Sequence, residues 1–107
     1  MKTVNIQPII DAVRNIERSE LSHALKLHGG SCDLEKTVPD PVSVEYWDEH
    51  DGPTSGTVTR VKLDPNSGIV ITLTDNRYCE TVEIDDDCIY PGSLSAITAA
   101  LPESARR

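Results

Sequence analysis

The sequence predicts one α+β domain, in which helical ends flank an antiparallel sheet. Apolar residues recur at spacings of three and four in residues 8–28 and again in 93–101, as on one face of a helix. Between Gly56 and Ile84, 12 of 29 residues are Val, Ile or Thr, the β-branched types that favour strands. The length of 107 residues suits a single domain over 1–107. We therefore expect an N-terminal helix or helix pair, a four- to five-stranded antiparallel meander and a short C-terminal helix.

The first helical segment is predicted over residues 8–28. Pro8 suits a first helical turn, because backbone N–H groups in that turn make no hydrogen bond within the helix and proline lacks only this group. Gly29-Gly30 supplies the permissive backbone that ends a helix. Ser19 could cap a second helix. Two predictions therefore stay open: one kinked helix over 8–28, or two helices over 8–17 and 19–28.

The middle of the chain is predicted to form the sheet. We expect strands at 42–47, 56–63, 69–74 and 78–84, with a short edge strand from Cys32 to Glu35. Residues 64–68 and 75–77 form short turns, and residues 50–55 a longer, mobile polar loop. Alternation places one set of side chains on the inner face: Val42, Val44, Tyr46, Val61, Leu63, Ile69, Ile71, Leu73, Val82 and Ile84.

A short helix is predicted over residues 93–101. Ser93 is the expected N-cap, and the apolar stripe of this helix ends at Leu101. Pro102 then stops the helix, and residues 102–107 form a tail.

The charge of the chain disfavours two classes of partner. The net charge is −8, and residues 31–92 hold four basic and fourteen acidic side chains. A nucleic-acid binder needs a clustered basic face, so we expect no direct nucleic-acid binding. The same charge disfavours an anionic membrane surface. The apolar runs are too short for a signal peptide or a membrane span, which predicts a cytoplasmic protein.

The three cysteines predict neither a disulfide framework nor a cofactor. Cys32, Cys79 and Cys88 are odd in number and form no Cys-x-x-Cys pair, so reduced, partly buried thiols are expected. A zinc site with His23 or His28 is disfavoured, because these two lie about 140° apart around a helix. We therefore predict no metal and no cofactor.

The predicted sheet region resembles a known family. Gly56-Thr57-Val58 opens a strand, residues 64–68 form an Asp-to-Gly turn, and Cys88-Ile89-Tyr90-Pro91 closes the stretch. Over residues 42–91 this resembles small SH3-like β-barrels of the Tudor kind. The resemblance implies a closed barrel and an aromatic cage for a methylated Lys or Arg, drawn from Tyr46, Trp47, Tyr78 and Tyr90. Alternation, however, puts Tyr46 and Trp47 on opposite faces.

A second resemblance covers most of the chain. Leu27-His28-Gly29-Gly30-Ser31 after a helix, together with Tyr90-Pro91-Gly92-Ser93-Leu94 before the last one, resembles short bacterial proteins of uncharacterised function. It implies no activity.

Two acidic segments are the main candidates for a site. Asp48-Glu49-His50-Asp51 holds three carboxylates and an imidazole, and Asp85-Asp86-Asp87 follows the last predicted strand. Either is a solvated loop or a patch for a cation or a partner. The first does not match a calcium-binding loop, because Gly52 stands fifth and the distal Glu is missing.

Together these features predict a non-enzymatic protein-interaction module. No nucleophile elbow, phosphate-binding loop or metalloprotease motif is present, so no catalytic residue is assigned. An acidic β face, residues 42–51 and 80–87, is expected to bind a protein with a basic surface. The predicted contact residues are Asp48, Glu49, His50, Asp51, Tyr78, Glu80, Asp85, Asp86, Asp87 and Tyr90.

Three further hypotheses stay open at this point. The chain could mimic nucleic acid and inhibit a nucleic-acid enzyme, if its carboxylates lie in a line. It could bind a metal or small ligand through Asp48, His50 and the Asp85–Asp87 turn. Homodimerisation through an unpaired sheet edge at 42–47 is a third hypothesis.

Overall fold

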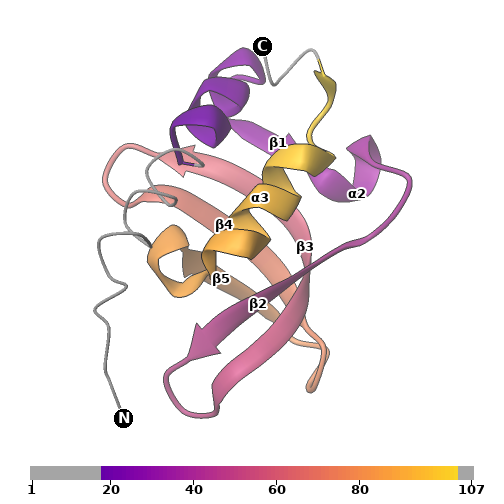
Figure 1. The fold of residues 1–107 in the computed structure, drawn as a ribbon, viewed down its shortest axis with the longest axis vertical. Helices are drawn as coiled ribbons and strands as arrows, with labels where there is room; N and C mark the ends of the chain where they lie inside the picture. Colours follow the sequence, from indigo (N-terminus) through magenta and orange to yellow (C-terminus); the bar gives the residue numbers. More distant parts are fainter. Residues whose placement is uncertain (1–17, 104–107) are drawn as a thin grey trace, which may run out of the picture.

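The computed structural model describes residues 18–103 and confirms the α+β fold (Figure 1). Residues 18–27 are helical. The later elements, in chain order, are β1 (Ser31–Asp33), α2 (Leu34–Thr37), β2 (Val42–Asp48), β3 (Gly52–Asp64), β4 (Gly68–Asp75), β5 (Thr81–Asp85), the 3₁₀ turn η1 (Asp86–Cys88) and α3 (Pro91–Ala100). The predicted helix over 8–17, the choice between one and two helices and residues 104–107 lie outside the described residues.

Five antiparallel strands form one sheet in the order β1-β3-β4-β5, and β2 also pairs with β3. The first half of the long strand β3 pairs with β2 and its second half with β1, so β1 and β2 follow one another along the same edge. The sheet is not closed into a barrel. A single bridge, Tyr46 to Ile89, links β2 to the chain beyond β5.

Several predicted boundaries are wrong. The long loop over 50–55 is absent, because Gly52–Ser55 continue β3 and pair with Glu45–Asp48. The turn before β5 is longer than expected, so β5 begins at Thr81 and not at residue 78. The predicted edge strand is displaced to Ser31–Asp33, and the chain turns helical at Leu34.

The helix of residues 18–27 ends as the Gly-Gly pair predicts. Gly29 and Gly30 have φ of 70° and 92°, in the left-handed region. The Gly30 N–H donates to the Leu25 carbonyl at 2.6 Å, and the Gly29 N–H donates to the Lys26 carbonyl at 3.2 Å. This pair of bonds is the Schellman arrangement, which satisfies the last carbonyls of a helix.

All three hairpins of the sheet turn on an aspartate. Oδ1 of Asp48, Asp64 and Asp75 accepts the backbone N–H groups two and three residues later, at 2.7–3.2 Å. The residue four positions after each aspartate has positive φ: Gly52 (76°), Gly68 (78°) and Cys79 (55°). These hydrogen bonds replace ladder bonds that a tight turn cannot make.

The core lies between the sheet and the helices. Six predicted inner residues are buried, and Val42, Leu63, Val82 and Ile84 pack against them partly exposed. Alternation alone missed Val58, which is 2% exposed. The register shifts between Val58 and Arg60, so this bulge lets both Val58 and Val61 face inward. At Gly56 a Cβ would lie 2.6 Å from Leu73 Cδ1 and 2.9 Å from the Thr74 carbonyl oxygen, so only glycine fits beside β4.

The C-terminal helix begins earlier than predicted. Pro91 opens α3, and its N-cap position is Tyr90. The predicted cap, Ser93, lies inside the helix, where its Oγ accepts the Glu45 N–H at 2.9 Å. α3 therefore docks on β2 and crosses in front of the sheet (Figure 1). Within residues 18–103, no helix has the length and apolar character needed to cross a bilayer.

Candidate interaction groove

One groove brings the end of β2 close to β5. It is about 310 Å³ in volume, and we call it the β2–β5 groove. Ten residues line it: Tyr46, Trp47, Asp48, Glu49, His50, Val82, Glu83, Ile84, Asp85 and Cys88. The sheet curls without closing, so two segments about 35 positions apart in the sequence share this surface.

The β5 side of the groove is an open sheet edge. β5 pairs with β4, and no strand of the described chain pairs with its other edge. The edge predicted for homodimerisation, 42–47, is covered at its centre. There the Glu45 N–H donates to Ser93 Oγ, and the Glu45 carbonyl accepts the Tyr90 N–H at 3.4 Å. Open strand pairing is thus offered by β5 and not by the middle of β2.

The groove is strongly acidic. Its lining includes Asp48, Glu49, Glu83 and Asp85 and contains no Lys or Arg. Within residues 18–103, Glu49, Glu83 and Asp85 form no ion pair with a basic side chain. Burial raises the pKa of the Cys88 thiol, and a hydrogen bond to Asp85 and the charges of Asp85, Asp87 and Glu49 raise it further. Burial first, and the negative charges around it second, therefore favour the neutral form of this thiol.

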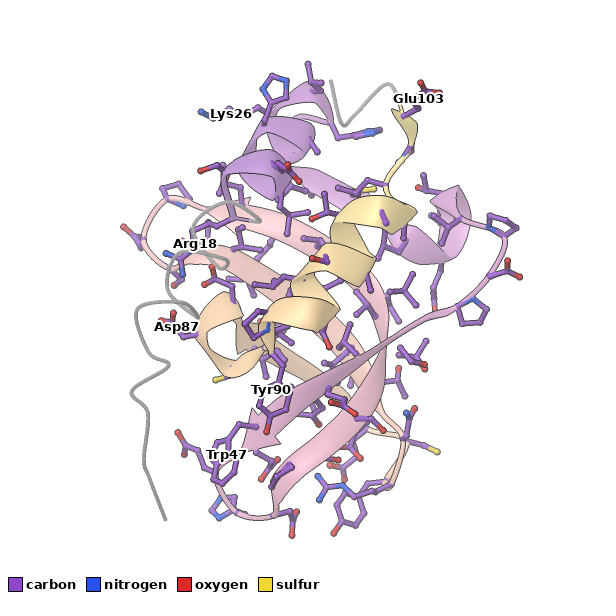
Figure 2. All side chains as sticks on the ribbon, viewed as in Figure 1. Arg18, Lys26, Trp47, Asp87, Tyr90 and Glu103 are labelled. Atoms are coloured by element: carbon purple, nitrogen blue, oxygen red, sulfur yellow. The ribbon has the colours of Figure 1, made fainter. Side chains whose placement is uncertain are left out.

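Trp47 is the aromatic side chain that the groove exposes. It is 52% exposed, whereas its neighbour Tyr46 is 1% exposed, as strand alternation predicts. The indole rests on the hairpin turn, where a Cβ at Gly52 would lie 3.7 Å from the ring. Figure 2 shows Trp47 at the lower end of β2. An exposed tryptophan in a hollow can anchor a partner by apolar and cation–π contact.

The aromatic residues do not form one cage. The Tyr46 hydroxyl is buried and donates to Asp75, so its ring belongs to the core. Tyr78 lies on the β4–β5 turn, with the Arg77 guanidinium 5.0 Å from its ring centroid. Tyr90 lines a separate hollow with Glu45 and Arg77. The cage that the Tudor resemblance implies is therefore not assembled from these four rings.

Arg77 organises the carboxylates next to the groove. Its guanidinium makes two hydrogen bonds to the Asp75 carboxylate, at 3.0 and 3.3 Å. It also lies 3.1 Å from Asp51 and 3.9 Å from Asp48. The side-chain bonds from Arg77 and then Tyr46 hold the pKa of Asp75 well below its usual range. Burial, and then the bond to Asp75, raises the pKa of Tyr46 to about 12.

The predicted Asp85–Asp87 patch is divided by the fold. The Asp86 side chain is 3% exposed and lies 2.5 Å from Arg18 Nε, while Asp87 Oδ1 lies 3.2 Å from Arg18 Nη2. Burial raises the pKa of Asp86, and Arg18 opposes that shift. The prediction of a solvated turn is therefore wrong at Asp86, which ties the helix of residues 18–27 to η1.

The ten predicted contact residues thus separate into groups. Asp48, Glu49, His50 and Asp85 line the β2–β5 groove. Six lie outside its lining: Asp51, Tyr78, Glu80, Asp86, Asp87 and Tyr90. The predicted face over 42–51 and 80–87 includes Trp47 and Glu83, but sequence reasoning named neither as a contact residue, and it left Cys88 outside the face. Glu83 had a usable signal, because it is an outward-facing acid on the last predicted strand.

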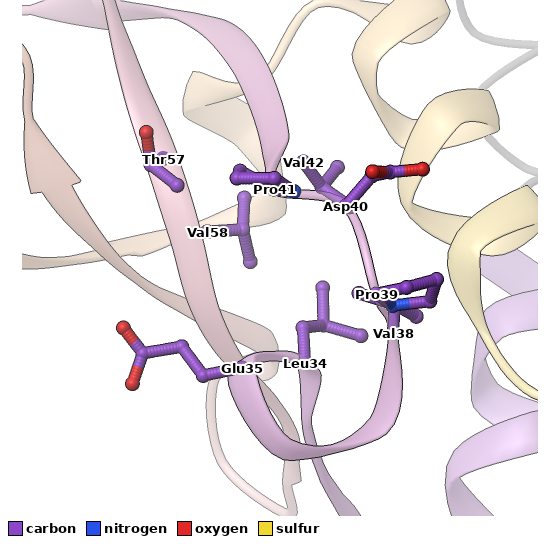
Figure 3. Close-up of a pocket in the computed structure, with 9 residues that line it drawn as sticks. All are labelled: Leu34, Glu35, Val38, Pro39, Asp40, Pro41, Val42, Thr57 and Val58. Carbon is purple, nitrogen blue, oxygen red and sulfur yellow. The ribbon is translucent and has the colours of Figure 1, made fainter.

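A second pocket lies between the α2–β2 connector and β3 (Figure 3). Its volume is about 300 Å³, and its residues are Leu34, Glu35, Val38, Pro39, Asp40, Pro41, Val42, Thr57 and Val58. Figure 3 shows the carboxylates of Glu35 and Asp40 pointing away from Leu34 and Val58. This pocket offers mainly aliphatic contact.

No set of metal ligands is assembled in the described part of the chain. Within residues 18–103, no three His, Cys, Asp or Glu side chains are placed to hold a metal ion. Asp48, His50 and Asp85–Asp87 are thus not gathered into one metal-binding set.

Comparison with known proteins gives no relative. No family model, no curated protein and no solved structure matches this chain.

Proposed function

We propose that this chain is a protein-interaction module that binds a basic partner through the β2–β5 groove. The supporting observation is the combination of an exposed Trp47 with Glu49, Glu83 and Asp85, three carboxylates without a basic partner in the described residues. Other acids of the region already form ion pairs within the chain. Asp48, Asp51 and Asp75 surround Arg77, and Asp86 pairs with Arg18.

The chemistry of this surface favours cations on a protein chain. Carboxylates around a hollow raise the local concentration of cations and speed their approach. The indole face adds attraction for a Lys or Arg side chain and apolar contact for its methylene stem. A bare ion would gain only the first of these contributions, so a peptide chain fits the groove better.

The test is a fluorescence titration with designed peptides. Trp47 is the only tryptophan of the chain, so its emission reports on the groove directly. We expect a nine-residue peptide of alternating Lys and Thr to change this emission, and the matching Glu–Thr peptide to leave it unchanged. Raising the salt from about 0.05 to 0.5 M should weaken binding about tenfold or more, because screening shortens the range of the charges.

Charge-matched variants provide the control. Glu49→Gln with Asp85→Asn removes two carboxylates from the groove, and Glu35→Gln with Asp40→Asn removes two from the pocket between the α2–β2 connector and β3. The first pair should weaken binding of the Lys–Thr peptide about tenfold, and the second less than twofold. Equal losses in both pairs, or no response of Trp47 to the peptide, would refute the proposal.

A further inference from the structure

The open edge of β5 forms one side of the acidic groove. We infer that the basic partner enters this groove as an extended strand and pairs with the free edge of β5. This inference rests on the proposed function and adds the conformation and the backbone contacts of the bound segment. It follows from the strand register, from the exposure along β5 and from the charges beside it.

The register identifies which backbone groups of β5 are free for a partner. The Asp75 N–H donates to the Glu80 carbonyl at 2.9 Å, where the β4–β5 hairpin begins. Hydrogen-bonded and non-hydrogen-bonded pairs alternate along an antiparallel ladder, and Leu73 pairs with Val82. Val82 and Ile84 therefore bond to β4, whereas Thr81 and Glu83 turn their N–H and C=O groups to the open edge.

The side chains of β5 suit a strand with one basic face. Val82 and Ile84 are half-buried against the core, while Thr81, Glu83 and Asp85 are exposed. A partner strand would place alternate residues opposite Glu83 and Asp85, where Lys or Arg gains from cross-strand attraction. Trp47 lines the same groove and would contact the partner strand from the β2 side.

The same charges argue against a second copy of this chain as the occupant. In a symmetric pairing of two β5 edges, Glu83 and Asp85 of each copy would lie among the carboxylates of the other. Like charges across a ladder are destabilising, and charged side chains on an edge strand act against edge-to-edge pairing. Charge complementarity thus selects a basic strand.

A proline at residue 83 tests the pairing. Glu83→Pro removes the outward N–H and leaves the bonds of Val82 and Ile84 to β4, which is the setting where an edge strand tolerates proline. Glu83→Gln removes the same charge and keeps the N–H. We expect Glu83→Pro to bind the Lys–Thr peptide about fivefold more weakly than Glu83→Gln, the effect of one lost backbone hydrogen bond.

Methylated peptides test the same strand pairing without any change in the protein, in case Glu83→Pro does not fold. The wild-type chain is titrated with a Lys–Thr peptide N-methylated at alternate residues, in both registers. One register should bind about tenfold more weakly than the unmodified peptide, and the amide of Glu83 should gain hydrogen-exchange protection in the unmodified complex.

The two proposals fail in different ways. If both methylated peptides bind as the unmodified one does, with no added protection at Glu83, the strand inference is wrong and the acidic groove stands. If equal affinities for Glu83→Pro and Glu83→Gln are measured in folded variants, the strand inference is also wrong. If the unmodified peptide does not bind, the proposed function itself has failed.

Discussion

Both carboxylate oxygens of the buried Asp75 accept hydrogen bonds. Its side chain is 3% exposed, a position where a charge without partners would be very unfavourable. Its two oxygens accept bonds from the Tyr46 hydroxyl, from the Arg77 guanidinium and from the N–H groups of Arg77 and Tyr78. The residue therefore joins the core, the β4–β5 turn and the rim of the groove.

Removing the hydroxyl of Tyr46 tests this cluster. Tyr46→Phe keeps the buried ring and deletes one hydrogen bond to a charged acceptor. We expect the free energy of unfolding to fall by about 1.5–3 kcal/mol, measured by urea denaturation. The control Tyr78→Phe, at a ring that is 60% exposed, should change it by less than about 0.5 kcal/mol. Equal effects at both positions would show that the hydroxyl of Tyr46 is not stabilising.

The three hairpins share one turn design at the scale of elements. Each uses an aspartate as backbone acceptor, and each places a left-handed residue four positions later. Two of the turns have glycine there, at Gly52 and Gly68, and the third has Cys79. A residue with a Cβ is strained at this φ, so the β4–β5 turn contains strain that the other two lack.

Exchanging the residue types tests this strain. Cys79→Gly should raise the free energy of unfolding by about 1 kcal/mol, because the relief of strain exceeds the added freedom of the unfolded chain. Gly68→Ala should lower the free energy of unfolding by about the same amount, because alanine is strained at the positive φ of this position. No clash adds to this effect, since no atom lies within 4 Å of the new Cβ. Urea denaturation measures both changes. If Cys79→Gly lowers the free energy of unfolding, the backbone at Cys79 is not strained.

At the scale of the whole molecule, the fold places seven acids of the sheet region in two sets. Asp48, Asp51, Asp75 and Asp86 lie beside Arg77 or Arg18 and hold elements together. Glu49, Glu83 and Asp85 lie together on the groove. The excess negative charge of the middle of the chain is thus partly structural and partly gathered on one surface.

Three aspartates that accept hydrogen bonds in the hairpin turns predict a loss of stability in acid. The pKa values of Asp48, Asp64 and Asp75 are lowered, chiefly by hydrogen bonds from turn N–H groups in the first two and from Arg77 in the third. A carboxyl with a lowered folded pKa stabilises the fold above its unfolded value, about 3.9, and loses this as pH falls through its folded pKa. Asp86 acts in the opposite sense, because its pKa is raised.

We expect the free energy of unfolding to fall as pH decreases from about 5 to 2. Asp75→Asn should be less stable than wild type at pH 7 and should show a clearly shallower fall. Asp64→Asn keeps an oxygen acceptor for the turn and should flatten the curve only slightly. Urea denaturation at four or five pH values measures both slopes. A wild-type slope in Asp75→Asn would mean that other groups govern the acid response.

Local features of the sequence determined the helix of residues 18–27, the five strands and the C-terminal helix in their order, but not α2 or η1. The period of apolar residues in 18–28 and 93–101, the Gly29-Gly30 pair and the Asp64–Gly68 turn act within a few residues, and a helix, a helix end and a hairpin turn form there. Most of the buried apolar side chains of the sheet followed from alternation for the same reason, since side-chain direction in a strand depends on neighbouring backbone alone. The acidic character of the surface was likewise present in composition.

Only the tertiary structure decided what depends on pairing between distant segments. Three features require partners more than ten residues away: the bulge after Val58, the covering of Glu45 by Ser93 and the burial of Asp86 beside Arg18. The edge of β5 is open because no described strand is brought beside it. The groove itself exists because a curled sheet, linked at Tyr46 and Ile89 but not closed, brings β2 near β5. Periodicity carries no information on such register and edge contacts, because many pairings satisfy the same local pattern.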